Sequence, residues 1–131
     1  MLADALAFFD AARLWLGDFV IMPNHCHALL LPASRWELEA LLGSIKKWSS
    51  REIGLWLQQQ PKTVRPSARR NGKPRFYQQE SYDRIVRDGE ELAVFREYIA
   101  HNPAAANLPP EAYTYRAAEW LDAFAPRPPP P

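Results

Sequence analysis

Apolar side chains recur at helical intervals between residues 2 and 15 and predict a short amphipathic helix. Gly17 and Asp18 are expected to end this helix, because both residues disfavour a helix interior. Two extended apolar runs follow, over residues 19–22 and 25–31, with a Pro-Asn turn between them. The N-terminal quarter of the chain therefore predicts a helix followed by two short strands.

A longer amphipathic pattern predicts a helix from about residue 36 to residue 56. Ser34 is the expected N-cap, and Glu37 three residues later would complete a capping box. The expected core face of this helix holds five apolar residues, namely Leu38, Leu41, Leu42, Ile45 and Trp48.

The second half of the chain begins with a Gln-, Pro-, Arg- and Lys-rich segment. Residues 58–75 lack sustained periodicity and predict a long surface loop. Residues 76–87 return to extended character. Asp88 is the expected N-cap of a helix over residues 89–102, which Pro103 would end. The expected core face of that helix holds Leu92, Phe95 and Ile99.

The C-terminal region predicts a last short helix over residues 117–124. Residues 126–131 are almost entirely proline and are expected to form an extended, disordered, solvated tail. Residues 1–125 then form one domain, which the 131-residue length favours over two. The mixture of helices and short strands predicts an α+β fold in which an antiparallel sheet is flanked by helices.

Composition narrows the class of protein. Apolar residues make up 47% of the chain, which is typical of a packed globular domain. The one cysteine, Cys26, excludes a disulfide within the chain and fits the reducing cytoplasm. Charged residues interrupt the apolar N-terminal stretch, so neither a signal peptide nor a membrane span is expected.

Charge is distributed very unevenly, although the net charge is only +1. The stretch from Lys46 to Arg87 carries a balance of +8, and the remainder a balance of −7. Such asymmetry is typical of a protein that binds a polyanion, and a solvated basic loop is the alternative. The candidate DNA-contacting residues are Lys46, Lys47, Arg51, Arg69, Arg70, Lys73, Arg75, Arg84 and Arg87.

The sharpest local motif is His25-Cys26-His27, set in an apolar strand. Alternating side chains place both histidines on one face of the strand, where two imidazoles can converge on one metal ion. A pair of surface or satisfied core histidines is the structural alternative. The histidine-triad nucleotide hydrolases are excluded, because the third histidine they need would stand at Leu29.

A second motif lies on the helix over residues 89–102. Tyr98 and Asn102 are one turn apart and share the polar face, so a phenol and an amide project together. The alternative interpretation of Tyr98 is a structural tyrosine at the boundary of the core with a solvent-exposed hydroxyl. His101 is interpreted as a residue favoured by the helix dipole rather than as a ligand.

Three segments together resemble the REP-associated tyrosine transposases, a branch of the HUH single-strand endonucleases. They are MPNHCHALLLP, RFYQQESYDRIVRD and EELAVFREYIAHNPAAANL, in an order and spacing that suit the family. Cys26 takes the place of a hydrophobic residue between the histidines and suits it as a small buried hydrophobe. Phe76-Tyr77-Gln78 has tyrosine where the family has tryptophan.

The resemblance implies a ferredoxin-like HUH endonuclease fold, with His25, His27 and Asn102 as ligands of Mg²⁺ or Mn²⁺ and Tyr98 as nucleophile. It also implies a first strand ahead of the first helix, which this chain lacks. Either an earlier start codon supplies that strand, or the chain is a truncated remnant. Its loss would leave unpaired backbone groups beside the histidine strand.

The predicted function is metal-dependent cleavage and rejoining of single-stranded DNA at hairpins, by a cytoplasmic, nucleoid-associated monomer or homodimer. Aromatic residues that could stack on unpaired bases are Phe76, Tyr77 and Tyr82. The principal alternative is a catalytically impaired remnant that binds DNA hairpins. A metal-storing or regulatory domain is a weaker third alternative, because it has no use for the basic stretch.

Overall fold

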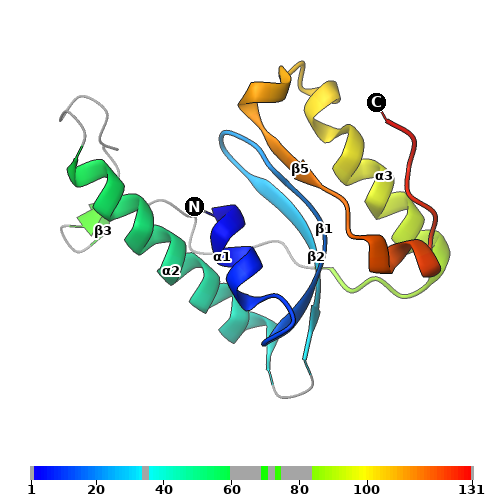
Figure 1. Cartoon of the computed structure of the whole chain (residues 1–131), viewed down its shortest axis with the longest axis horizontal. Helices are drawn as coiled ribbons and strands as arrows, with labels where there is room; N and C mark the ends of the chain where they lie inside the picture. The colour runs from blue at the N-terminus through cyan, green and yellow to red at the C-terminus, as the bar shows by residue number, and fades with distance from the viewer. Residues whose placement is uncertain (1, 34–35, 60–68, 71–72, 75–83, 131) are drawn as a thin grey trace.

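The computed structural model describes residues 2–33, 36–59, 69–70, 73–74 and 84–130. A three-stranded antiparallel sheet has helices α1 and α2 on one side and α3 on the other (Figure 1). The predicted α+β class is confirmed. The elements are α1 (Leu2–Phe9), β1 (Leu14–Ile21), β2 (Cys26–Pro32), α2 (Leu38–Gln58), β3 (Arg69–Arg70), β4 (Lys73–Pro74), α3 (Gly89–Ala105) and β5 (Thr114–Arg116), with 3₁₀ turns at Pro110–Ala112 and Glu119–Ala123.

The sheet has the strand order β2-β1-β5. A tight hairpin joins β1 to β2, and the Met22 amide donates to the His25 carbonyl across its turn at 2.8 Å. The predicted Pro-Asn turn and the second strand are therefore confirmed. Strand β5, which the sequence pattern did not predict, pairs with β1 on its other edge from Phe19–Arg116 to Ile21–Thr114.

The boundary between α1 and β1 differs from the prediction. The helix ends at Phe9, and Leu14 belongs to β1 rather than to a helix extending to residue 15. The Asp10 carboxylate accepts from the Leu16 amide at 2.8 Å, and Ala11 adopts a φ of 61° in the turn. A local Asp-centred turn thus replaces the predicted last helical turn.

Gly17 and Asp18 lie inside β1 and form a bulge, so the prediction that they end an element is wrong. The register advances three residues on β1, from Leu16 to Phe19, while β2 advances only two. The extra residue shifts the alternation, so that Leu14 and Phe19 both belong to the core beneath α1 and α2. Without the bulge, the second half of β1 would present the opposite face.

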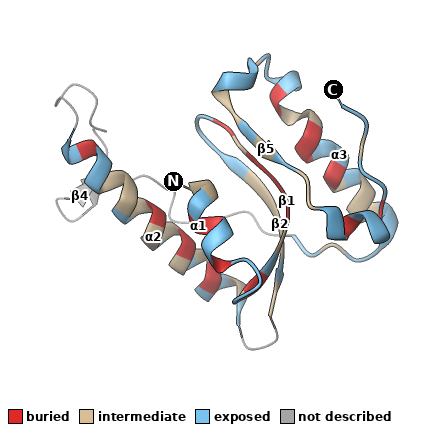
Figure 2. Cartoon of the chain, viewed as in Figure 1, coloured by how far each residue is buried: buried red, intermediate tan, exposed pale blue. Residues whose placement is uncertain are grey.

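Two apolar cores lie on the two faces of the sheet, and β1 is buried between them along most of its length (Figure 2). The larger core, between the sheet and α1 with α2, contains Ala5, Leu6, Phe9, Leu14, Phe19, Leu41 and Ile45. The smaller core, under α3, contains Val20, Met22 and Ile99. The two-sided sheet explains why β1 is apolar at successive positions rather than at alternate ones.

Helix α2 begins two residues later than predicted, at Leu38. Its N-cap is Glu37 rather than the predicted Ser34, and Glu37 makes no side-chain capping hydrogen bond. The predicted capping box depends on Ser34. Ser34 lies outside the described residues. The predicted core face is confirmed at Leu41 and Ile45, which are buried against α1.

Helix α3 begins as predicted and ends later. The Asp88 side chain accepts from the Glu91 amide at 2.8 Å, which confirms the N-cap. Pro103 lies inside the helix, which continues to Ala105. The true stop is Asn107, whose φ of 54° is left-handed, and the Leu108 amide donates back to the Pro103 carbonyl in a Schellman motif.

The segment predicted as a long loop contains a short antiparallel pair, β3 with β4. Gln58, predicted to begin this loop, is the last residue of α2. Residues 60–68, 71–72 and 75 of the segment, and residues 76–83 of the predicted extended run, lie outside the described residues. Residues 84–87 belong to neither helix nor strand. Among the described helices, none combines the length and apolar character that a membrane span requires.

The C-terminal segment folds back along α3 (Figure 1). The predicted last helix is a 3₁₀ turn, Glu119–Ala123. The proline-rich end, expected to be solvated, makes contacts with the domain, since the Pro129 carbonyl lies 3.0 Å from His101 Nε2. Arg127 pairs with Asp122 at 3.3 Å.

Arg96 of α3 fastens this segment to the sheet. Its guanidinium is fully buried and donates from Nε to Asp18 in the bulge at 2.8 Å and from Nη1 to Asp122 at 2.8 Å. Further bonds reach the carbonyls of Ala118 and Ala125. One side chain thereby joins α3, β1 and the C-terminal segment, and hydrogen bonding to Arg96 holds the pKa of the Asp122 carboxyl below its usual value.

We expect Gly17→Ala to lower the free energy of unfolding by about 1–3 kcal/mol. An added Cβ would lie 2.8 Å from both the Cβ and the carbonyl oxygen of Leu29, so the hairpin would have to separate. Gly43→Ala on α2 is the matched control, because nothing lies within 4 Å of its Cβ. The control should gain about 0.5–1 kcal/mol from helix propensity. Urea denaturation measures the stability of both variants. Equal midpoints for Gly17→Ala and Gly43→Ala would contradict the requirement for glycine in the bulge.

We expect Arg96→Met to lower the free energy of unfolding by about 3–5 kcal/mol, since it leaves the Asp18 carboxylate buried and uncompensated. Arg96→Lys should also be destabilising, because an ammonium cannot reproduce the planar set of donors. Arg84→Met removes an ion pair to Glu91 whose arginine is 61% exposed, and should change stability by less than about 0.5 kcal/mol. Chemical denaturation measures the free energy of unfolding of the three variants. It distinguishes the stabilisation by the buried Arg96 ion pair from that by the exposed Arg84–Glu91 pair.

Candidate functional site

The two histidines lie at the end of the β1–β2 hairpin. His25 precedes β2 directly, and its ring centroid is 5.1 Å from that of His27. His27 is paired with Val20 of the smaller core, so it faces α3. Cys26 is paired with Ile21 on the opposite face, as the alternation predicted, but it is exposed rather than buried.

Asn24, in the hairpin turn, orients His25. Its Oδ1 lies 2.6 Å from His25 Nδ1. An amide oxygen only accepts, so Nδ1 donates and the neutral ring keeps its lone pair on Nε2. This arrangement leaves the outer nitrogen of His25 available to a metal ion, in the way that second partners fix ligand histidines.

Tyr98 reaches the histidine pair from α3. Its ring stands edge-on to His27, with the centroids 5.2 Å apart and an interplanar angle of 75°. The side chain is 53% exposed, so the hydroxyl remains accessible. The structure therefore brings together two motifs that are 71 positions apart in the sequence.

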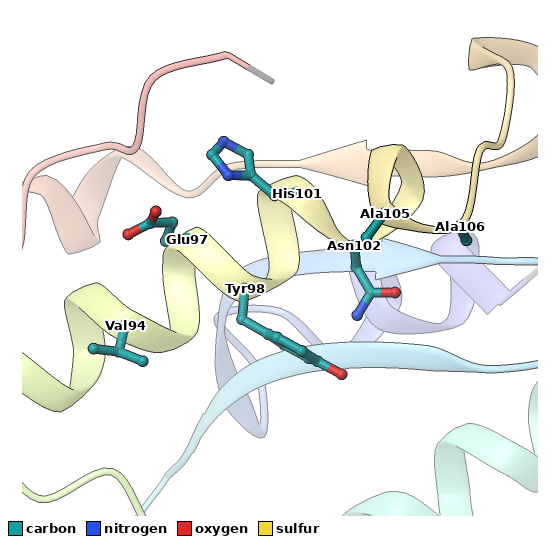
Figure 3. Close-up of a pocket in the computed structure, with 7 residues that line it drawn as sticks. All are labelled: Val94, Glu97, Tyr98, His101, Asn102, Ala105 and Ala106. Carbon is teal, nitrogen blue, oxygen red and sulfur yellow. The ribbon is translucent and has the colours of Figure 1, made fainter.

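Asn102 projects from the same side of α3 as Tyr98, while Glu97 and His101 project from another side (Figure 3). The prediction that Tyr98 and Asn102 share a face is confirmed. These residues border a shallow, open depression along α3, and none of the described residues that line it is a lysine or an arginine. The polar side chains among these lining residues are the Glu97 carboxylate, the Tyr98 phenol, the His101 imidazole and the Asn102 amide.

The environment keeps His27 in its neutral form. Partial burial and the neighbouring His25 both lower the pKa of the His27 imidazole from its usual value. A neutral imidazole is the form that binds metals, so both effects favour a ligand role near neutral pH.

The donor set at this surface is small. In the described parts of the chain, no three His, Cys, Asp or Glu side chains come together as a metal-binding group. The predicted ligands His25, His27 and Asn102 supply two imidazoles and one amide, so substrate or water oxygens would have to complete the shell of Mg²⁺ or Mn²⁺.

Among the described side chains, the predicted DNA-contacting residues do not form one surface around the histidines. Lys46, Lys47 and Arg51 lie on α2, which packs on the sheet face opposite α3. Arg84 pairs with Glu91 at 2.9 Å and its guanidinium lies over Phe95, whereas Arg87 is exposed.

The remaining basic residues belong to the segment between α2 and α3. Arg69, Arg70 and Lys73 belong to β3 and β4, a two-stranded pair of whose side chains nothing is described. Arg75 and the aromatic residues Phe76, Tyr77 and Tyr82 lie outside the described residues.

Comparison with known proteins adds no family assignment, because no family model, curated protein or solved structure matches the chain. The site must therefore be interpreted from its own chemistry.

Two residues of this region were missed by sequence reasoning. Asn24 stands next to His25, and its polar side chain at a turn was a usable signal for an orienting role. Arg96 gave no comparable signal, since an arginine in a charged helix is usually solvent-exposed. Its partner Asp18 is 78 positions away, so only the folded structure reveals the pair.

We expect Asn24→Ala to weaken Mn²⁺ binding by about 10–100-fold, because His25 loses the partner that fixes its ring and tautomer. Asn24→Asp keeps an acceptor oxygen at the same place and should retain binding. Isothermal titration with Mn²⁺ measures both variants. Equal affinities for Asn24→Ala and the unmodified protein would contradict the orienting role.

Proposed function

We propose that this protein is a metal-dependent endonuclease and strand transferase for single-stranded DNA, with Tyr98 as nucleophile. The observation that carries the proposal is the contact between His27 and Tyr98, which joins the histidine hairpin to α3. A tyrosine beside two metal-binding side chains, with an open surface in front of it, suits attack on a phosphodiester.

Tyr98 Oη would attack the scissile phosphorus in line. The new bond joins Oη to phosphorus, and the bond from phosphorus to the 3′ oxygen breaks. The phenolic proton passes to solvent, and the leaving oxygen takes up a proton to become a 3′-hydroxyl. The product is a 5′-phosphotyrosine that retains the ester, so a 3′-hydroxyl can reverse the step and rejoin strands.

His25, His27 and Asn102 are the residues that would hold the metal. Bound Mg²⁺ or Mn²⁺ supplies Lewis-acid polarisation of a phosphate oxygen. The contact with Asn24 leaves the lone pair of His25 on Nε2, and the lowered pKa of His27 keeps that ring neutral. A free phenol has a pKa near 10, so Tyr98 requires such electrostatic help near neutral pH.

The ferredoxin-like HUH fold and the relationship to REP-associated tyrosine transposases are part of the proposal. The Tyr98–Asn102 helix face and the His25–His27 hairpin support it, because both meet on one side of the sheet. Within the described residues β2 is an edge strand, so its outer backbone groups are accessible to a further strand. Hairpin-bearing single strands are the proposed substrate.

We expect a covalent protein–DNA adduct when the protein is incubated with hairpin-bearing single-stranded DNA, labelled at its 3′ end, and Mn²⁺ or Mg²⁺. Tyr98→Phe should abolish the adduct, because phenylalanine keeps the ring but lacks the attacking oxygen. Tyr113→Phe is the matched control, since Tyr113 packs against the smaller core next to β5, the strand at the other edge of the sheet from β2. Denaturing gel electrophoresis measures the adduct.

The same gel separates the proposal from its main alternative. An adduct that is lost with EDTA or His27→Ala supports a metal-dependent nuclease. Hairpin binding without any adduct under all metal conditions would instead identify a catalytically impaired DNA-binding protein.

A further inference from the structure

The helices on the other face of the sheet carry an exposed aromatic stack. Phe8 of α1 and Trp48 of α2 lie nearly parallel, with their ring centroids 5.9 Å apart and an interplanar angle of 10°. Phe8 is 64% exposed, while its neighbour Phe9 is buried in the larger core. We call Phe8 and Trp48 the aromatic platform.

The larger core does not require Phe8. Helix α1 already buries Ala5, Leu6 and Phe9 on its inner side, so the Phe8 ring is presented outward. A ring stacked on one side and accessible on the other has the geometry in which a nucleic-acid base extends the stack. Exposed aromatic rings without a stacked partner lack this feature.

Positive charge lies beside the aromatic platform. Lys47 precedes Trp48, and Arg51 follows it by three residues, so the two cations lie one helical turn apart. Both are exposed, and neither forms an ion pair with a carboxylate in the described part of the chain. The acidic residues nearest in sequence are Asp10, two residues after Phe8, Asp4, one turn before it, and the half-buried Glu52 after Arg51.

We propose that the aromatic platform, with Lys47 and Arg51, is a second contact surface for single-stranded DNA. An unpaired base stacks on Phe8, and the two cations contact the flanking phosphates. The inference rests on the proposed function for its choice of DNA. It places a second DNA-binding surface on the opposite face of the sheet, separate from His27 and Tyr98.

Binding is measured as fluorescence anisotropy of a labelled oligothymidylate in EDTA, on a Tyr98→Phe background that can neither cleave nor form an adduct. Phe8→Leu should bind about tenfold more weakly, because it keeps apolar bulk and loses the stacking face. Phe8→Trp should bind at least as tightly as phenylalanine. The double variant Lys47→Gln, Arg51→Gln should reduce the slope of log affinity against log salt concentration by about 1.4 in magnitude, because two phosphate contacts are lost.

Phe124→Leu is the matched control. Phe124 is 67% exposed and also neighbours a tryptophan, but its ring stands at 80° to Trp120 rather than parallel. This variant should bind like the parent. Thermal unfolding of each variant confirms that the exposed substitutions leave the fold intact.

Three outcomes would overturn the inference. Equal affinities for Phe8→Leu and Phe8→Trp would exclude base stacking, while leaving DNA binding and the nuclease proposal standing. A shift from dimer to monomer in Phe8→Leu, seen by sedimentation velocity, would identify the platform as an interface between copies of the chain. Absence of DNA binding by the parent protein would remove the premise shared with the proposed function.

Discussion

The buried ion pair between Arg96 and Asp18 is the interaction on which the arrangement of this domain depends. It connects α3 to the bulge of β1, and through Asp122 and two backbone carbonyls it also holds the C-terminal segment. Removing two charges from water is costly, so the pair is stabilising only because every donor of the guanidinium is satisfied. Geometry at this junction is therefore fixed tightly, with little tolerance for a shift of α3.

That anchor also sets the position of the candidate nucleophile. Arg96 and Tyr98 are two residues apart on α3, so their side chains point to nearly opposite sides of the helix. With Arg96 held against the bulge, Tyr98 faces β2 and its ring meets His27. The bulge depends on Gly17, because the missing Cβ lets β2 approach β1 closely. The close packing of the two strands and the alignment of Tyr98 with His27 therefore both depend on this bulge.

The sequence was informative where local patterns determine structure, as in the core face of α2, the Asp88 cap and the histidine hairpin. It misplaced the start of β1 because Gly17 and Asp18 are helix-breaking residues in most contexts, whereas here they form a bulge. Strand β5 has only three residues, too few for a readable alternation. The meeting of His27 with Tyr98 followed from the family resemblance and not from spacing, since it is a tertiary contact.

The position of positive charge changes how the proposed chemistry must work. The sequence places a basic stretch between the two motifs, which favours one continuous grip around the reacting phosphate. In the structure, Lys47 and Arg51 lie on the far face of the sheet, and none of the described residues that line the depression at Tyr98 is a lysine or an arginine. Arg96, the nearest arginine in sequence, is already paired with the buried Asp18 and with Asp122. Among the described residues, the two imidazoles, as metal ligands, are therefore the groups to which the proposed reaction assigns the task of offsetting charge that develops on the phosphate.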